Sequence, residues 1–323
     1  MTERLLLLDT ASLYFRAFFG SPEILSPGGT NVNAVRGLLD YISRLTEQYE
    51  PTHLVCCWDD DWRPQWRVDL IPTYKAHRVV EEVAGAPVAE GSGERSDRRY
   101  VEEVPDPLEQ QVPIIREVLD AFGIAVIGAP GYEADDVIGT LATGAGMPVD
   151  VVTGDRDLFQ LVDDEAAVRI LYVGRGVGRH ERVDEAWVLE KYGVRAGQYA
   201  DFATLRGDAS DGLPGVKGVG EKTAASLLQK YDDIAGIRAA VEDPSSDLGP
   251  GPRLKIRDAS DYLDVAPTVV AVARDIDLPR DHLALPKAPA DADRLAGLVE
   301  EWGLATPVAR LTGVLAGLDG PAT

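Results

Sequence analysis

The segment GYEADDVIGTLATGAGMPVDVVTGDRD, residues 131–157, is the part of the sequence that indicates the fold most clearly. Its residues 132–145 predict a helix that begins with acids, which suits the positive N-terminus of a helix. Residues 149–155, VDVVTGD, predict a strand that runs into Asp155. A helix that leads into a strand ending at an acid is typical of an α/β protein.

The same alternation extends along the rest of the first half of the chain. Residues 4–8 are continuously apolar and predict a buried parallel strand that is closed by Asp9. The other expected elements, in chain order, are a helix at 33–48, a strand at 53–58 that ends at Asp59, a helix at 108–122 and a strand at 124–129. We therefore expect an α/β fold with a mainly parallel central sheet flanked by helices.

Two segments depart from this pattern. Residues 79–107 mix acids, Gly, Ser and Pro with little periodicity, and a segment of this length is typical of a functional lid or an irregular loop. After residue 184 the sequence becomes mostly helical. We expect an α/β core at 1–183 with an insertion at about 79–107, and a helical region at 184–323 whose residues 283–318 pack back onto the core.

The composition favours a reducing setting. The chain has 323 residues, 45% of them hydrophobic, and no apolar run approaches the ~20 residues that span a bilayer. Cys56 and Cys57 are adjacent, which makes them poor disulfide partners, and they lack the spacing of a metal finger. We expect a cytoplasmic protein with no membrane partner.

The net charge of −22 argues against a nucleic-acid partner when it is taken alone. However, the rate at which a protein meets DNA depends on where its charges lie on the surface, and not on the net charge alone. Residues 212–231 carry Lys217, Lys222 and Lys230 against only Glu221. This local excess of positive charge keeps DNA binding open.

Acids gather where the predicted strands hand over to loops or helices. They are Asp9; Asp59; Glu133, Asp135 and Asp136; Asp155 and Asp157; and Asp208 and Asp211. The carboxyl ends of parallel strands meet at one edge of a sheet. Carboxylates gathered there repel one another and lose hydration, and hard divalent cations such as Mg²⁺ or Mn²⁺ offset both costs. Two such ions can clamp one phosphate, so the pattern predicts a metal-dependent site that cleaves phosphodiesters.

Each acid also has a simpler interpretation. Asp9 or Asp59 alone could cap a helix, GDRD could form a turn, and EADD could merely charge a helix start. The coincidence of several such clusters makes this explanation of all of them together improbable. The four histidines show no metal-ligand spacing and no nucleophilic partner, which disfavours a zinc or catalytic-triad enzyme.

The segment GLPGVKGVGEKTAASLLQKY, residues 212–231, is the most specific motif. Its glycines permit a tight turn, and residues 221–231 are helical in pattern. A glycine turn that opens a helix presents backbone N–H groups to a phosphate without reading base sequence. An ordinary turn between two helices is the alternative, and the Walker phosphate-loop pattern is absent.

These motifs together resemble the 5′-nuclease family, which comprises flap endonucleases and the 5′→3′ exonuclease domain of bacterial DNA polymerase I. The matching strings are LLLLDT…LYFRAF, YKAHR, GYEADDVIGTLA, TGDRDLFQLV and GDASDGLPGVKGVGEKTA, which cover residues 4–232 in family order. No polymerase region follows, so the chain is similar to a stand-alone bacterial form. The resemblance implies a PIN-like 5′-nuclease fold with a helix–two-turn–helix motif at about 205–231.

The resemblance also implies roles for particular residues. The acids matching those around a first metal ion, here the first acid group, are Asp9, Asp59, Glu133, Asp135 and Asp136. Those matching a second ion, here the second acid group, are Asp155, Asp157, Asp208 and Asp211. The basic and aromatic residues matched to the scissile phosphate and the flap are Arg16, Tyr74, Lys75 and Arg78. The duplex-binding turn is matched by Gly215, Lys217, Gly218, Gly220, Lys222 and Thr223, with K⁺ expected at its carbonyls.

Two departures from the family pattern concern loops. The family often has Asn after the second acid of the GDASD string, where this chain has Gly212, and we expect this to alter a loop contact and not the metal site. The segment after Arg78 matches the arch through which a single-stranded 5′ end passes. Its acids at 81, 82, 90, 94, 97, 102 and 103 outnumber Arg95, Arg98 and Arg99.

We therefore expect a structure-dependent 5′ nuclease, both flap endonuclease and 5′→3′ exonuclease, that hydrolyses flapped or 5′-ended DNA with two or more Mg²⁺ or Mn²⁺ ions in replication and repair. We expect a monomer that binds branched DNA and has a functional link to a DNA polymerase or ligase. A ribonuclease with the same sheet, a catalytically silent scaffold for branched DNA, and a small-molecule phosphatase are the rival interpretations. The duplex-binding motif argues against the first and third, and the full set of acids argues against the second.

Overall fold

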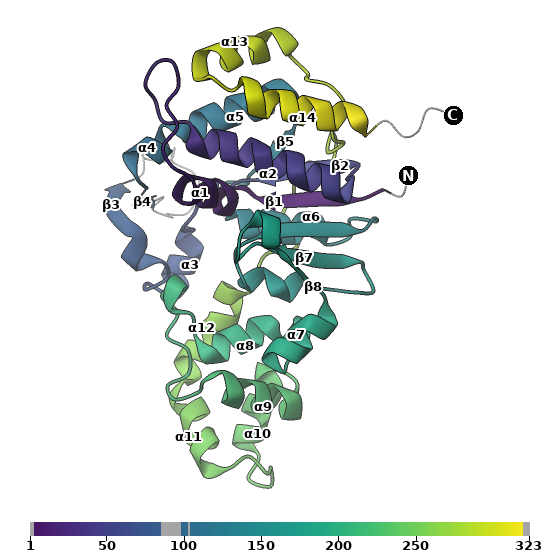
Figure 1. The fold of residues 1–323 in the computed structure, drawn as a ribbon. Coiled ribbons are helices and arrows are strands. Elements are labelled where there is room, and N and C mark those ends of the chain that lie inside the picture. Colours follow the sequence, from purple (N-terminus) through teal and green to yellow (C-terminus); the bar gives the residue numbers. More distant parts are fainter. Residues whose placement is uncertain (1–2, 85–97, 103, 319–323) are drawn as a thin grey trace.

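The computed structural model describes residues 3–84, 98–102 and 104–318. Its centre is a six-stranded sheet in the order β5-β2-β1-β6-β7-β8 (Figure 1). The strands are β1 (Leu5–Asp9), β2 (His53–Cys57), β5 (Ala125–Ile127), β6 (Val149–Thr153), β7 (Val168–Tyr172) and β8 (Glu181–Val183). All neighbouring pairs are parallel except β7 and β8, which are antiparallel.

The sheet is buried on both faces because β1 is apolar at every position before its final acid. Leu5 and Leu7 contribute to one hydrophobic cluster, and Leu6 and Leu8 to the other, as the two-residue period of a strand requires. On one face lie α1 (Thr10–Gly20), α2 (Asn33–Tyr49) and α5 (Gln111–Phe122). On the other lie α6 (Ala134–Ala142) and the 3₁₀ segment η2 (Asp157–Leu161). The predicted α/β class with a mainly parallel sheet is confirmed.

Most of the second half of the chain is helical and lies beside the β7–β8 side of the sheet (Figure 1). Its helices are α7 (Glu185–Tyr192), α8 (Tyr199–Arg206), α9 (Glu221–Tyr231), α10 (Ile234–Glu242), α11 (Pro250–Asp258) and α12 (Ser260–Val270). The turns at 207–220 join α8 to α9, as the helix–two-turn–helix expectation requires.

The C-terminal helices return to the sheet. In Figure 1, α13 (Ala292–Trp302) and α14 (Ala305–Gly317), in yellow, lie against α5 and α2. Leu295, Leu298, Leu311 and Leu315 are buried in the same hydrophobic cluster as these two helices. The chain therefore crosses from the sheet to the helical region and back, as expected for residues 283–318.

Several short elements surround the expected insertion. They are α3 (Gln65–Leu70), the 3₁₀ segment η1 (Ala76–Arg78), the antiparallel strands β3 (Val79–Ala84) and β4 (Arg98–Glu102), and α4 (Asp106–Glu109). The described part of the insertion is thus a hairpin, and the remaining part of the predicted arch, 85–97 and 103, lies outside the described residues. The strands β7 and β8 were not expected from the sequence. They form an antiparallel pair at the edge of the sheet, and no helix separates them to produce the alternation of strand and helix.

Candidate metal centre

The ends of β1, β2 and β6 bring three of the predicted acids to one edge of the sheet. Asp9 is the last residue of β1 and pairs in register with Cys57 of β2. Asp59 follows β2 by two residues, and Asp155 follows β6 by two residues. Since these strands are parallel neighbours, acids that are far apart in the sequence become neighbours in space.

Asp9 is almost completely buried, and its environment favours the neutral form. One carboxylate oxygen accepts a hydrogen bond from the Ser12 amide at 3.2 Å, and the other accepts one from the Thr153 hydroxyl at 2.7 Å. Burial, reinforced by the charges of Asp59 and Asp155, raises the pKa of Asp9 to about 7 despite these bonds. A bound cation would reverse that preference.

Glu133 caps the N-terminus of α6 and is held by a cluster of buried side chains. Its carboxylate accepts a hydrogen bond from the Tyr74 hydroxyl at 2.7 Å and forms an ion pair with the Lys75 ammonium group. Arg67 approaches the same carboxylate at 3.2 Å. Burial alone would lower the pKa of Lys75, but the charge of Glu133 raises it well above its usual value, so Lys75 is a fixed cation.

Asp136 has partners that leave it little capacity as a metal ligand. Arg67 donates to both of its oxygens, at 2.8 and 2.7 Å. The Ala273 amide at 2.8 Å and the Glu133 amide at 3.2 Å donate to them as well. Asp136 is completely buried, so this fork of two parallel bonds is a structural contact between α3 and α6. The structure thus gives Asp136 a different environment from the other predicted ligands.

Asp59 and Asp135 complete the first acid group. Asp59 accepts a hydrogen bond from the Ala134 amide at 2.8 Å, and burial raises its pKa. Burial and then the charges of Asp155 and Asp9 raise the pKa of Asp135 well above its usual value. Both carboxylates therefore favour the addition of positive charge.

The second acid group lies on two loops. Asp155 is exposed and accepts from the Asp157 amide at 2.9 Å. Asp208 accepts from the Ser210 amide at 2.8 Å and pairs with Arg206 at 3.3 Å. Asp211 is buried and pairs with Arg78 at 3.2 Å. Backbone amides thus hold Asp155 and Asp208, and the side chains of Arg206 and Arg78, which are 12% and 35% exposed, pair with Asp208 and Asp211.

The two acid groups meet at a small internal cavity and are linked by the charge of Asp155. Burial is the main cause of the raised pKa values of Asp9, Asp135, Asp157 and Asp211, and the charge of Asp155 adds to the rise in all four. A cavity of about 10 Å³ is lined by acids of both groups: Glu133 and Asp135 from the first, and Asp157 and Asp211 from the second. The acids thus form one continuous cluster.

The cluster fits divalent cations by its chemistry. One oxygen of Asp157 is buried with no hydrogen-bond partner, and burial and then Asp155 raise the pKa of this acid well above its usual value. Oxygen donors of this kind suit Mg²⁺ or Mn²⁺. Within the described residues, no three Asp, Glu, His or Cys side chains are already arranged to hold a metal ion. The metal-ligand roles of the nine acids therefore stay a prediction.

The predicted basic and aromatic residues lie on either side of this cluster. Tyr74 and Lys75 are buried beside Glu133, so Tyr74 presents its hydroxyl to a carboxylate. Arg78 donates to the Ser210 carbonyl at 2.8 Å and remains partly exposed. Arg16 lies beside Gly154, where a Cβ atom would be 2.9 Å from its guanidinium, and its Nε atom is buried without a partner.

Gly212 joins the loop of the second acid group to the YKAHR segment. Its backbone has φ of +69°, and a Cβ atom there would lie 2.0 Å from the Thr73 carbonyl oxygen. The Thr73 hydroxyl donates to the Gly212 carbonyl at 2.8 Å, and the Lys75 amide donates to the Asp211 carbonyl at 2.9 Å. A glycine is needed at this close backbone approach.

The residues predicted to contact the DNA backbone lie on the turns before α9 and in its first turn, directly after Asp208 and Asp211 in the sequence. Lys217, Gly218, Gly220 and Lys222 are exposed, whereas Gly215 and Thr223 are half-buried. Gly215 has φ of +65°, and a Cβ atom would lie 2.5 Å from the Gly207 amide nitrogen. The tight packing of these turns leaves the two lysines accessible.

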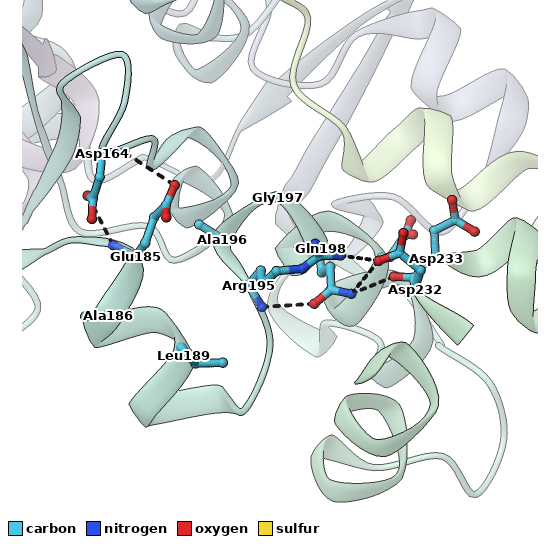
Figure 2. A pocket seen from close by; sticks show the side chains of 11 residues that line it. Asp164, Glu185, Ala186, Leu189, Arg195, Ala196, Gly197, Gln198, Asp232 and Asp233 are labelled. Atoms are coloured by element: carbon cyan, nitrogen blue, oxygen red, sulfur yellow. Dashed lines mark hydrogen bonds and ion pairs between the residues drawn. The ribbon is translucent and has the colours of Figure 1, made fainter. Parts of the chain in front are cut away.

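A different cavity, of about 670 Å³, lies in the helical region. Figure 2 shows that Asp164, Glu185, Asp232 and Asp233 line it together with Arg195. Arg195 pairs with Asp232, and the Asp164 and Glu185 backbone amides exchange hydrogen bonds with each other's carboxylates (Figure 2). These acids are already partnered, and none belongs to the predicted site.

The sequence matches family models along most of its length. Residues 4–193 match the 5′-3′ exonuclease N-terminal resolvase-like domain, and residues 194–293 match the 5′-3′ exonuclease C-terminal SAM fold. The chain belongs to the 5′-3′ exonuclease family. The family predicted from the motifs is thereby confirmed, and with it an enzyme that hydrolyses phosphodiester bonds.

Relatives in this family include both stand-alone and fused forms. The chain is 58% identical to a 5′-3′ exonuclease of Streptomyces coelicolor, over 95% of this chain and 98% of that one. It is 49% identical to a 5′-3′ exonuclease of Mycobacterium tuberculosis, over 99% and 100% of the two chains. It is 36% identical to DNA polymerase I of the same species, of which it covers 32%.

A solved structure supports the fold assignment. A bacteriophage T5 flap endonuclease, in complex with DNA and metal ions, has a TM-score of 0.64 to this exonuclease-family chain and 14% sequence identity, over 98% of this chain and 99% of that one. Across the described parts of the chain, no helix combines the length and apolar character that crossing a bilayer requires.

Sequence reasoning missed two residues that organise this family member's site. Arg67 holds Asp136 and Glu133, and Thr153 donates to Asp9. Arg67 stands in a segment that also contains Arg63 and Trp66, and nothing in its spacing distinguishes it from a surface arginine. Thr153 is the first residue of the TGDRD string and the last residue of β6. Its position at the end of a strand, where the acids also gather, is the one sequence feature that could have indicated its role.

Proposed function

We propose that this exonuclease-family chain is a structure-dependent 5′ nuclease that cleaves flapped or 5′-ended DNA by two-metal-ion hydrolysis. The observation that carries the proposal is the small cavity that acids of both groups, Glu133, Asp135, Asp157 and Asp211, line together. A phosphodiester is the substrate that such a cluster suits, because paired cations held by these acids would neutralise the charge of its oxygens. When bound, Mg²⁺ or Mn²⁺ would supply a water nucleophile and charge neutralisation at the leaving oxygen.

The acids would divide between two sites. Asp9, Asp59 and Asp135 have the carboxylates suited to the first ion, and Asp157, Asp208 and Asp211 those suited to the second, with Asp155 facing both. Glu133 would take part through its pairing with Lys75. We retain Asp136 in the predicted set as a positioning residue, because Arg67 already saturates its oxygens.

The basic residues would act on the substrate's charge. Lys75 is a buried cation beside Glu133, and Arg78 is a partly exposed cation beside Asp211. Fixed positive groups stabilise charge that develops on a phosphate in the transition state. Arg16, near Gly154, would hold the adjacent phosphate, and Tyr74 would keep Glu133 oriented through its hydroxyl.

The glycine turns would hold the duplex. Lys217 and Lys222 are accessible at the N-terminal end of α9, where backbone amides also face outward. The ammonium group of Lys255 already donates to the Gly218 carbonyl at 2.7 Å, so an expected K⁺ ion at this carbonyl would compete with a resident cation. We therefore give K⁺ no role in the proposed cleavage reaction.

The remaining assignments are part of the same proposal. The α/β core at 1–183, with its arch insertion at about 79–107, would carry the chemistry, and the region at 184–323 would carry the duplex contact. The relatives include DNA polymerase I, which supports a functional link to a polymerase in replication and repair. A monomer in the cytoplasm that also cooperates with a ligase fits this role.

A labelled 5′-flap DNA tests the proposal. The wild-type protein should release short products with Mg²⁺ or Mn²⁺ and none in EDTA, and Asp135→Asn and Asp155→Asn should each lose most of this activity. Normal cleavage by both variants would contradict the metal site. An RNA flap and a flap with a blocked 5′ end, run in parallel, separate a ribonuclease and a non-threading cutter from the proposed enzyme.

A further inference from the structure

One lysine from outside the glycine motif reaches the turns before α9. Lys255 lies on α11, and its ammonium group donates a hydrogen bond to the Gly218 carbonyl at 2.7 Å, across 37 positions of sequence. A Cβ atom at Gly218 would lie 3.2 Å from both the Cε and the Nζ atoms of Lys255. The charged end of this side chain therefore lies directly over the turn.

The packing of α11 holds Lys255 in this position. On the same helix, Arg253 donates to the Asp243 carbonyl at 3.1 Å and to the Ser246 hydroxyl at 2.7 Å. These bonds connect α11 with the segment after α10, and α10 packs against α9 in the lowest part of Figure 1. Ile256, which follows Lys255, is buried. The lysine therefore stands on a helix that is anchored on both sides of it in the sequence.

The Gly218 carbonyl has a different kind of partner from the neighbouring carbonyls of the turn. The Val216 carbonyl accepts a hydrogen bond from the Val219 amide at 2.9 Å. The Gly220 carbonyl accepts from two backbone amides in the first turn of α9, at 3.0 and 2.9 Å. Gly218 has φ of +78°, a left-handed conformation that favours glycine, and its carbonyl accepts from Lys255. The partner of this carbonyl is thus a positive charge and not a backbone amide.

The expected K⁺ ion does not fit at this carbonyl. Potassium and a lysine ammonium group are both monovalent cations that carbonyl oxygens attract, and two of them at one oxygen would repel each other. Lys255 is tethered to the protein, so it is present at this oxygen whatever the potassium concentration. An ammonium group has three N–H donors. Among the described residues Lys255 uses one of them, at Gly218, which leaves two for a ligand.

We infer that Lys255 takes the place of a bound monovalent metal ion at the glycine turn, and that its ammonium group bridges the Gly218 carbonyl and a phosphate of the duplex. The inference rests on the proposed function and specifies how that function's duplex contact is held. Phosphate oxygens accept the remaining N–H donors, and the contact reads no base sequence. Duplex binding is therefore expected to be the same in potassium and sodium salts.

Duplex binding in two salts tests this inference. Fluorescence anisotropy, with Ca²⁺ in place of Mg²⁺, gives the Kd of the full-length protein for a labelled flap DNA in KCl and in NaCl. The two salts are used at equal ionic strength, so that general screening is the same. Wild-type protein should give Kd values that agree within about twofold.

Lys255→Met keeps most of the aliphatic stem and removes the charge and its donors. The Kd of this variant in NaCl should be about fivefold higher than that of wild-type protein, the size expected for one charged contact near the surface. Its binding should recover in part in KCl, because the exposed Gly218 carbonyl then accepts K⁺. A preference for potassium should thus appear only when the lysine is removed.

Two further variants separate this role from a general effect of charge. Arg257→Gln removes a positive charge from an exposed position of the same helix, about 200° around it from Lys255, and should leave the ratio of the two Kd values unchanged. Lys255→Arg keeps a cation over the turn and should bind more tightly in NaCl than Lys255→Met does. Melting temperatures show whether each variant folds.

The inference is overturned if wild-type protein binds several-fold more tightly in KCl than in NaCl, because K⁺ would then displace the lysine. It is also overturned if Lys255→Met binds like wild-type protein in NaCl, or binds equally weakly in both salts. Should Lys255→Met not fold, the comparison of the two salts with wild-type protein decides alone. Cleavage of the same flap DNA by wild-type protein with Mg²⁺ is measured in parallel, and its absence would instead refute the proposed function.

Discussion

In the first acid group, Glu133 and Asp136 are buried against two resident cations, whereas in the second group Asp211 pairs with an arginine that is partly in water. Arg67 and Lys75 lie inside the protein beside Glu133 and Asp136, with side chains 3% and 11% exposed. Arg78, which pairs with Asp211, has a side chain 35% exposed. Buried charges must be paired, because an unpaired charge in the interior is costly. Glu133 and Asp136 are therefore held by cations of the folded core, whereas Asp211 is held by a cation that reaches the solvent.

The largest expected effect concerns the buried arginine. Arg67→Met leaves Asp136 and Glu133 with less compensation, and it should lower the free energy of unfolding by about 3–5 kcal/mol. Arg78→Met, in the second group, should cost about 1 kcal/mol because its charge is partly in water. Urea denaturation in EDTA measures both. If Arg67→Met and Arg78→Met lowered the free energy of unfolding by the same amount, the two arginines would not differ in how strongly they support the fold.

The next effect separates activity from stability. Asp157→Asn removes a buried carboxylate oxygen that has no partner, so it should leave the melting temperature in EDTA unchanged or higher. Its cleavage rate with Mg²⁺ should fall by about 100-fold or more. Asp136→Asn should instead lower the melting temperature, because it breaks the fork with Arg67. The comparison fails if Asp157→Asn melts as early as Asp136→Asn.

A pH titration examines the first group in the absence of metal. The pKa of Asp9 is raised from 3.8 to about 7 in the folded protein, so the folded state binds the extra proton between these values. Its contribution to stability is present below about pH 4 and is lost as the pH rises through about 7. Melting temperatures in EDTA should therefore decline more steeply across this range for wild-type protein than for Asp9→Asn. If the melting temperatures of the two proteins declined equally with pH, the raised pKa of Asp9 would be contradicted.

The smallest effect lies in the helical region. Lys217→Gln removes one accessible charge near the turns before α9, and it should weaken duplex binding several-fold while reducing the salt slope by about 1. Lys191→Gln, an exposed lysine on α7, should change neither quantity. Fluorescence anisotropy at several salt concentrations, in Ca²⁺, provides the measurement. A slope that is unchanged for Lys217→Gln would remove this lysine from the interface.

The sequence was sufficient for the fold class, because periodicity and strand-end residues are local properties. Apolar runs predicted β1 and β2, the segment that runs into Asp155 predicted β6, and residues 221–231 are the helix α9. The short strands β7 and β8 were not predicted, since their pairing depends on each other and on β6. The family followed from motifs that are themselves local strings.

Acids at the ends of parallel strands and a glycine turn before α9 can both be recognised in the sequence. Which of those acids are already paired depends on contacts that form only in the folded protein. Arg67 reaches Asp136 across 69 positions of sequence, and Thr153 reaches Asp9 across 144. Such contacts are fixed by how helices pack on the sheet, and no spacing along the chain encodes them. Helix packing likewise brings Lys255 of α11 to the glycine turn before α9, across 37 positions.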